Sequence, residues 1–299
     1  FDKILKHKPS AKLNIHINWD RQKKQLVIRD DAHGMELEEF KRAILLNQPP
    51  PDRTGRSEYG MGLKMAACWL SNRWKVVSKQ AGSPTEYSVD VDVQKLSSDN
   101  PDSILVTRKA LREEETHYTR IELNSVIRQI RANTVTQIKN RIAATYRRDI
   151  ESGSVSVYWN QEKIEYENPY RVPMVSIFGD EEQAWEKTLQ FDVTSSGATT
   201  LPVKGTVWVG ATGSYRNQGI DIFRRGRMVL GNAISQYKPQ EIYGASNSSV
   251  SLRLGMELDL DEWPASTNKD AILWGAPLYD RHGTPLAPTE TEFLDALKA

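Results

Sequence analysis

The stretch "TGRSEYGMGLKMAACW", Thr54 to Trp69, puts three glycines and a lysine at the start of a predicted helix. Loops of this kind usually bind a phosphate. Two of the glycines have P-loop spacing, but Met61 and Gly62 occupy the positions where that motif needs Lys and Ser or Thr. A dinucleotide-binding fingerprint needs a glycine at Met65 and a strand directly before the loop, whereas the preceding residues are rich in proline. Both familiar phosphate loops are therefore excluded.

The glycines still suit an anion on physical grounds. Gly60 and Gly62 let backbone N–H groups approach a ligand at the N-terminus of the predicted helix Leu63 to Leu70. The helix dipole and the unpaired N–H groups favour negative charge there, and Lys64 adds a positive charge. Because a Gly-x-Gly turn before a helix is more often ordinary turn chemistry, a phosphate site needs a second signal.

The second signal is "VIRDDAHGM", Val27 to Met35, in which a predicted strand ends in an acidic turn. The turn contains Ala32 and Gly34. A carboxylate accepts hydrogen bonds, so Asp30 suits the exocyclic amine of adenine. Taken together, the two motifs indicate an adenine-nucleotide site.

At this point the sequence resembles the GHKL ATPases, which share the Bergerat fold and include gyrase-type topoisomerases, Hsp90 chaperones, histidine kinases, MutL and MORC proteins. Their D-x-G-x-G-M pattern appears at 30–35 with Ala32 in place of the first glycine. Their glycine box appears at 59–64, and their G-T-x-[IV] strand at 118–121 without its glycine. The "GLK" ending and the doubled aspartate look most like MORC proteins.

The resemblance implies ATP as ligand, Mg²⁺ as cofactor and ATP hydrolysis as activity. Asp30 would bind the adenine amine with Thr119 beside it, partly through water, while Gly34 and Met35 would wall the base. The implied nucleotide-binding residues are Asp30, Ala32, Gly34, Met35, Gly55, Tyr59, Gly60, Met61, Gly62, Leu63, Lys64 and Thr119.

The general base and the metal ligand are the elements that the chain lacks. In this family a Glu polarises the attacking water and an Asn holds Mg²⁺, both on a helix before the acidic turn. No E-x-x-x-N precedes Asp30, and "FDKILKHKP" resembles only the tail of such a helix. Either the catalytic turn lies before Phe1 or the protein binds ATP without cutting it, and we favour the first interpretation. No metal ligands are found in the chain itself, and His33 is read as a solvent-facing turn residue.

Composition bounds the remaining classes. The 299 residues suggest two domains, and 40 Lys and Arg against 39 Asp and Glu give a net charge of +1, so nothing drives the whole chain toward nucleic acid or membrane. No apolar run reaches the roughly 18 residues of a membrane span. The single Cys68 excludes an internal disulfide and is expected to be a buried small hydrophobe. We expect a cytoplasmic protein, or a nuclear one if it is eukaryotic, with no membrane partner.

The pattern of predicted elements favours an α+β fold. Alternating segments predict a hairpin from Ala11 to Asp30, a helix follows within 35–47, and further strands are expected at 73–80, 85–93, 103–109 and 117–124. A helix from about Ser125 to about Ile150, with Ile127 in its apolar stripe, is expected to connect the halves, and a second β-rich region to begin at Val155.

With the resemblance added, the predicted domains are a Bergerat ATP-binding sandwich at 1–124, a connecting helix and a ribosomal-S5-like transducer at 125–275, and a C-terminal linker with a short helix at 276–299. "GIDIFRRGRMVLG", 219–231, looks like the transducer's strand–turn–strand element. "WPASTNKDAILW", 263–274, looks like the loop whose lysine reaches the γ-phosphate, which makes Lys269 the candidate sensor.

The function that the resemblance implies is an ATP-driven clamp that dimerises when nucleotide binds. DNA would be the client of a MORC-like or MutL-like protein, and arginines such as Arg216, Arg224, Arg225 and Arg227 permit DNA contact. An Hsp90-like chaperone and a non-hydrolysing, nucleotide-gated binding module are the alternatives. A histidine kinase is disfavoured because a long region follows Leu123. Further C-terminal domains or partner proteins are also expected.

Overall fold

A computed structural model describes residues 11–45, 48, 51, 55–56, 60–99, 103–111, 116–178, 181–231, 235–278 and 286–299. The chain forms two compact units. The first comprises Phe1–Ala143 and Arg147–Tyr166, and the second comprises Ala144–Tyr146 and Glu167–Ala299. Among the described residues, no helix is both long and apolar enough to span a bilayer.

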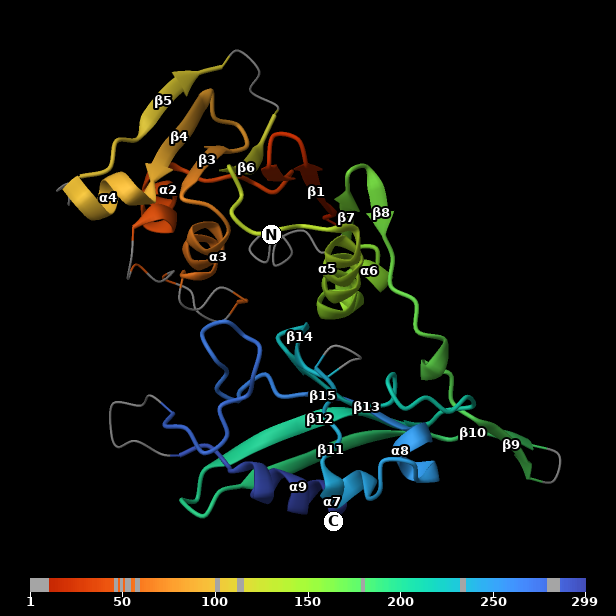
Figure 1. Ribbon diagram of the computed structural model, residues 1–299. Helices are drawn as coiled ribbons and strands as arrows, with labels where there is room; N and C mark the ends of the chain where they lie inside the picture. The colour runs from red at the N-terminus through yellow and green to blue at the C-terminus, as the bar shows by residue number, and fades with distance from the viewer. Residues whose placement is uncertain are drawn as a thin grey trace. The chain divides into compact units, whose positions relative to one another are not determined.

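The first unit is built on an eight-stranded mixed sheet with the strand order β5-β4-β3-β6-β2-β1-β7-β8 (Figure 1). All neighbouring strands are antiparallel except β1 and β7, which are parallel. The strands are β1 (Leu13–Asp20), β2 (Gln25–Asp30), β3 (Arg73–Lys79), β4 (Thr85–Asp92), β5 (Thr107–Ala110), β6 (Tyr118–Asn124), β7 (Val155–Trp159) and β8 (Glu162–Ile164).

Helices α2 (Leu37–Ile44), α3 (Gly62–Leu70) and α5 (Ala132–Thr145) pack against this sheet, and α4 (Val93–Asp99) and α6 (Arg147–Glu151) are short. Phe40 from α2 and Val76 from β3 are fully buried in the shared core. Burying an aromatic or branched side chain stabilises the fold by about 1.5–3 kcal/mol, so this core fixes the strands that carry the acidic turn.

The predicted hairpin and the helix after it are confirmed. β1 and β2 pair from Ile15 with Asp30 to Asp20 with Gln25. The Asp20 side chain accepts hydrogen bonds from the backbone N–H groups of Gln22 and Lys23, at 2.9 and 3.0 Å, which closes the turn. The predicted helix within 35–47 is α2.

The connecting helix begins later than predicted. α5 starts at Ala132, ends at Thr145 and is followed by the separate helix α6. Ile127 is 55% exposed instead of lying in an apolar stripe. Its N–H donates to the Leu70 carbonyl oxygen at 2.9 Å, so the segment before α5 is held by α3 rather than wound into a helix. Within α5, Ile138 and Ile142 pack on the core as expected.

Two further expectations differ from the structure. The second β-rich region was expected from Val155, but β7 pairs with β1 over Leu13 to Ile17 and thereby extends the first sheet. A parallel pairing between segments this far apart in sequence leaves no local signal. Cys68 is exposed, not buried, because it lies on the outer face of α3. Helix α4 was not predicted at all.

The second unit contains a five-stranded mixed sheet, order β11-β12-β15-β13-β14, and a two-stranded ribbon of β9 and β10. The bounds are β9 (Val175–Phe178), β10 (Glu181–Ala184), β11 (Glu186–Thr194), β12 (Thr200–Val209), β13 (Gly219–Arg224), β14 (Arg227–Leu230) and β15 (Leu254–Asp259). The strand–turn–strand element predicted at 219–231 is the hairpin of β13 and β14.

Helices α7 (Gln240–Tyr243), α8 (Ser249–Arg253) and α9 (Glu290–Lys298) complete the second unit. Trp263 and Phe293 are fully buried and meet edge to face, with ring centroids 5.8 Å apart. The expected C-terminal helix is α9, which begins with a capping box in which Thr289 and Glu292 each bind the other's backbone N–H.

Candidate functional site

Asp30 ends β2 directly opposite Thr119 of β6. The Asp30 carboxylate is half-buried and accepts the Ala32 N–H at 3.0 Å. Burial raises the pKa of Asp30 and outweighs the opposing effect of hydrogen bonds from the Ala32 and Thr119 backbones. A carboxylate has about four acceptor positions, so it can accept from a ligand amine as well. This geometry suits the exocyclic amine of adenine.

The neighbouring Asp31 has a different role. It is exposed, and its two carboxylate oxygens accept the backbone N–H and the side-chain amide of Asn14, both at 2.7 Å. These bonds tie the start of the acidic turn to β1. The structure therefore separates the doubled aspartate into a partly buried site residue and an exposed anchor.

The turn after Asp31 is seated on the end of β3. The His33 carbonyl oxygen accepts the Ala81 N–H at 2.9 Å, and the Met35 N–H donates to the Ser78 Oγ at 3.0 Å. Gly34 has φ of +72°, and a Cβ added there would lie 1.9 Å from the Lys79 carbonyl oxygen. Only glycine fits both the conformation and the space. His33 itself is exposed, as expected.

Ala32 and Met35 supply the apolar part of the turn. Both are partly buried and pack against the core of the first unit. The Ala32 carbonyl oxygen lies 2.8 Å from the His117 Nδ1. An alanine at this position is therefore accommodated where the related motif has glycine, and the role of Met35 in walling the base stays a prediction.

Ser78 lies beside Thr119 although no sequence motif marks it. It is fully buried, and its Oγ lies 3.1 Å from the Thr119 Oγ1 and 3.2 Å from the Tyr118 carbonyl oxygen. Ser78 and Thr119 are direct partners in the ladder of β3 and β6. The only signal in the sequence is a small polar residue inside the apolar run of "WKVVSK".

The glycine box forms the N-terminus of α3. Gly60 has φ of +63°, which favours glycine, and Met61 is the N-cap without a side-chain cap. Gly62 is exposed with open space around it, and Leu63 packs on the core. The first N–H groups of α3 thus have no cap from the Met61 side chain, and they suit an anion.

Lys64 is buried instead of reaching into solvent at the start of α3. Its side chain is only 3% exposed, and the Nζ donates to the Leu45 carbonyl oxygen at 2.6 Å, at the C-terminus of α2. Burial lowers the pKa of Lys64. A cation at a helix C-terminus is electrostatically favourable. In the structure Lys64 joins α3 to α2, and its predicted contact with phosphate stays a proposal.

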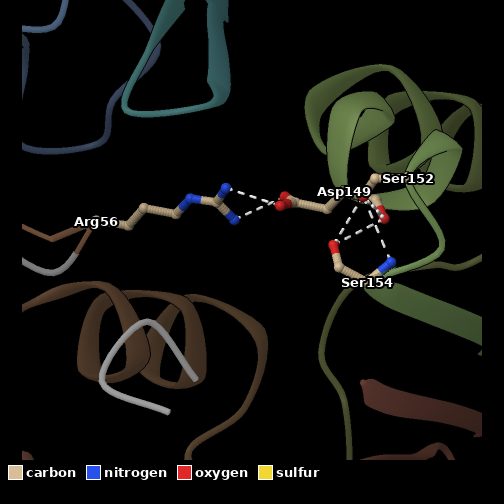
Figure 2. A network of polar contacts seen from close by, with 4 residues as sticks. All are labelled: Arg56, Asp149, Ser152 and Ser154. Carbon is tan, nitrogen blue, oxygen red and sulfur yellow. Dashed lines mark hydrogen bonds and ion pairs between the residues drawn. The ribbon is translucent and has the colours of Figure 1, made fainter. Parts of the chain in front are cut away.

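Part of the predicted phosphate loop lies outside the described residues, including Tyr59. Gly55 and Arg56 are described, and Arg56 makes a bidentate ion pair with Asp149 of α6, at 2.7 and 2.9 Å. The hydroxyls of Ser152 and Ser154 both donate to the Asp149 carbonyl oxygen at 3.1 Å (Figure 2). These bonds hold the backbone of the residue whose carboxylate binds Arg56.

We expect the Arg56–Asp149 pair to stabilise the first unit measurably. Their side chains are 27% and 11% exposed, so water screens the pair only in part. In a double-mutant cycle with Arg56→Ala and Asp149→Ala, urea unfolding should give an interaction energy of about 1–2 kcal/mol. The matched comparison is Lys75→Ala with Asp90→Ala, a more exposed pair, expected at about 0.5 kcal/mol. Additive effects at Arg56 and Asp149 would contradict this assignment.

Lys269 lies in the second unit, in a tight turn. Its backbone N–H donates to the Ser266 carbonyl oxygen at 2.8 Å, and its φ is +57°. The Ser266 hydroxyl donates to the Asp270 carboxylate at 2.7 Å, and Ala265 bridges to Ile272. The turn holds a non-glycine residue in a left-handed conformation, a kind of strain that occurs often at functional sites.

The predicted Mg²⁺ has no assembled ligand set in the described part of the chain. There, no three His, Cys, Asp or Glu side chains gather in a way that would hold a metal ion. The cofactor therefore stays a proposal.

Three features of the first unit belong together. The acidic end of β2 faces a threonine of β6, a glycine turn is seated on the end of β3, and glycines lead into the N-terminus of α3. Residues 9–125 match the family described as "Histidine kinase-, DNA gyrase B-, and HSP90-like ATPase". This part of the chain is a GHKL-type ATPase domain.

Among solved structures, the chain is similar to the ATPase region of Saccharomyces cerevisiae topoisomerase II, at 10% identity and a TM-score of 0.52 over 90% of this chain and 73% of that one. The same region bound to ICRF-187 (dexrazoxane) matches at 11% identity with the same TM-score and coverage. A search of curated proteins finds no match. The predicted α+β class, an ATPase sheet followed by a second mixed-sheet domain, is confirmed.

Proposed function

We propose that the chain is the motor part of an ATP-driven molecular clamp, which binds ATP through the site around Asp30 and hydrolyses it with Mg²⁺. The row formed by Asp30 and Thr119 on adjacent strands carries the proposal, because it offers a carboxylate and a hydroxyl to the edge of a base. The GHKL-type domain supports ATP as the ligand.

The proposed nucleotide contacts follow the order of the chain. Asp30 and Thr119 bind the adenine edge, and Ala32, Gly34 and Met35 form the turn beside it. The phosphates lie against Gly55 and the segment 59–64, where the N–H groups at the start of α3 favour negative charge. Lys269 of the second domain is the proposed sensor of the γ-phosphate.

We further propose that ATP brings two copies of the chain together and that the client is DNA, as in a MORC-like protein. The similarity to the topoisomerase II region extends over both units, which supports a clamp with a second domain more than a single-domain kinase. Arg216 of the second unit is exposed and Arg225 is partly exposed, and both suit phosphate contacts.

Nucleotide binding and phosphate release test the proposed function directly. The natural full-length protein should bind ATP in calorimetry and release phosphate when Mg²⁺ is added, with release falling when EDTA removes the metal. Absence of ATP binding would refute the proposal. Binding without release would leave the non-hydrolysing, nucleotide-gated module as the function.

Dimerisation and client identity need separate measurements. Light scattering should show a dimer with a non-hydrolysable ATP analogue and a monomer without it. DNA affinity should fall linearly on a log–log plot against salt concentration, because each phosphate contact releases counterions. A dimer with no salt-dependent DNA affinity would favour a protein client, as in a chaperone.

A further inference from the structure

Three side chains form a polar row across three neighbouring strands of the first sheet. Asp30 of β2 faces Thr119 of β6, and Thr119 faces Ser78 of β3. Directly opposed residues lie on the same face of a sheet with Cβ atoms about 5 Å apart. Thr119 therefore stands between a carboxylate on one side and the buried hydroxyl of Ser78 on the other.

The protons in this row can be counted. The Ser78 hydroxyl has one proton and two acceptor positions, and the Met35 N–H uses one of the acceptor positions. The Ser78 proton then goes either to the Thr119 Oγ1, at 3.1 Å, or to the Tyr118 carbonyl oxygen, at 3.2 Å. In the first case the Thr119 proton points outward, and in the second Thr119 donates to Ser78 instead.

A ligand acceptor decides between the two arrangements. Only in the first is the Thr119 proton available to the ligand, because in the second it is used in the bond to Ser78. Ser78 must then donate to Thr119. The buried Ser78 cannot turn to water, because it is fully enclosed and also holds the Met35 N–H.

We propose that Ser78 is a positioning residue that makes Thr119 a hydrogen-bond donor to the adenine ring. The inference rests on the proposed binding of ATP at Asp30. Adenine presents a donor amine beside an acceptor nitrogen, N1, which matches a carboxylate acceptor beside a hydroxyl donor. Without Ser78, the Thr119 hydroxyl is free to rotate and the match with N1 is lost, whether the contact is direct or through one water.

The experiment compares ATP with 1-deaza-ATP, which keeps the amine but lacks the N1 acceptor. The wild type should bind ATP about 10-fold more tightly than the analogue, the value of one well-made hydrogen bond. For Ser78→Ala the ratio of the two dissociation constants should fall to about 2, and Ser78→Thr, which keeps a hydroxyl, should restore it. Should Ser78→Ala fail to fold, Ser78→Cys keeps most of the volume with only a weak donor and should lower the ratio in the same way.

The matched control is Ser71→Ala, which removes another fully buried serine hydroxyl, one that bonds the backbone of Arg73. It should lower stability and leave the ratio of dissociation constants unchanged. A purely structural role for Ser78 would weaken both ligands equally, and an unchanged ratio in Ser78→Ala would overturn the inference. If the wild type binds neither nucleotide, the proposed function fails instead, so the two failures are distinguishable.

Discussion

Replacing Gly34 by alanine is expected to lower the free energy of unfolding by about 3–5 kcal/mol and to abolish nucleotide binding. The left-handed conformation alone costs an alanine about 1–2 kcal/mol. The larger part comes from the new Cβ, which would lie 1.9 Å from the Lys79 carbonyl oxygen and 2.9 Å from the Gln80 nitrogen. Since both atoms are backbone, relief requires the turn to lift off the end of β3. Urea unfolding followed by circular dichroism measures the loss.

Gly82→Ala is the matched control, because Gly82 has nearly the same φ, +73°, and a Cβ there would meet nothing within 4 Å. It should cost only the conformational term, about 1–2 kcal/mol, and leave nucleotide affinity unchanged. Equal losses in the two variants would show that the contact between the turn and β3 does not hold the turn in place.

Local patterns were enough to predict the elements that carry the acidic turn. The alternation in 11–30 predicted the hairpin, because each residue of an antiparallel pair is close to its partner in sequence. The acidic residues of the first turn marked the start of α2, where Glu38 and Glu39 favour the helix dipole. The strands that carry Asp30 and Thr119 were both predicted, but their pairing joins distant segments and was implied only by the family resemblance.

Contacts between distant segments could not be predicted in the same way. The pairing of β7 with β1 joins residues more than 130 positions apart, so periodicity assigned β7 to the wrong region. The buried end of Lys64 also depends on a distant carbonyl oxygen, at Leu45. A sequence shows a lysine after glycines as a positive charge, but only the packing of α3 against α2 decides where that charge lies.

The site residue Ser78 shows the same limit in a different form. Serine in a strand is unremarkable by composition, and its importance comes from three contacts supplied by the acidic turn and by β6. The motifs could be read from the sequence because each is contiguous. The residue that links them belongs to neither motif, so it emerged only from the register of β3 with β6.

Asp30→Asn is expected to weaken ATP binding about 100-fold or more while leaving the fold intact. A charge-assisted hydrogen bond to the adenine amine is worth about 1.5–3 kcal/mol, and an amide group turned toward that amine leaves two donors facing one another. The Asn side-chain oxygen can still accept the Ala32 N–H, so the turn keeps its local bond. Calorimetry with ATP measures the loss, and circular dichroism checks the fold.

Asp31→Asn is the matched control. It removes the same charge from the neighbouring residue, whose side chain is exposed and held by Asn14. Its affinity for ATP should stay within about 3-fold of the wild type, as expected for a screened surface charge. Similar losses in both variants would mean that the charge of the turn, not the Asp30 carboxylate itself, binds the nucleotide.

Asp30→Asn should also stabilise the nucleotide-free protein at neutral pH. Burial raises the pKa of Asp30 in the folded protein, so the folded state holds this proton more tightly than the unfolded chain does. The wild type's free energy of unfolding therefore falls as the pH rises from the unfolded pKa to the folded pKa, and above the latter the full cost of burying the charge is present. Asn carries no charge, so the variant should unfold at higher urea than the wild type at pH 7, with the difference vanishing near about pH 3. A variant less stable at pH 7 would show that the carboxylate is stabilised by its neighbours rather than held ready for a ligand.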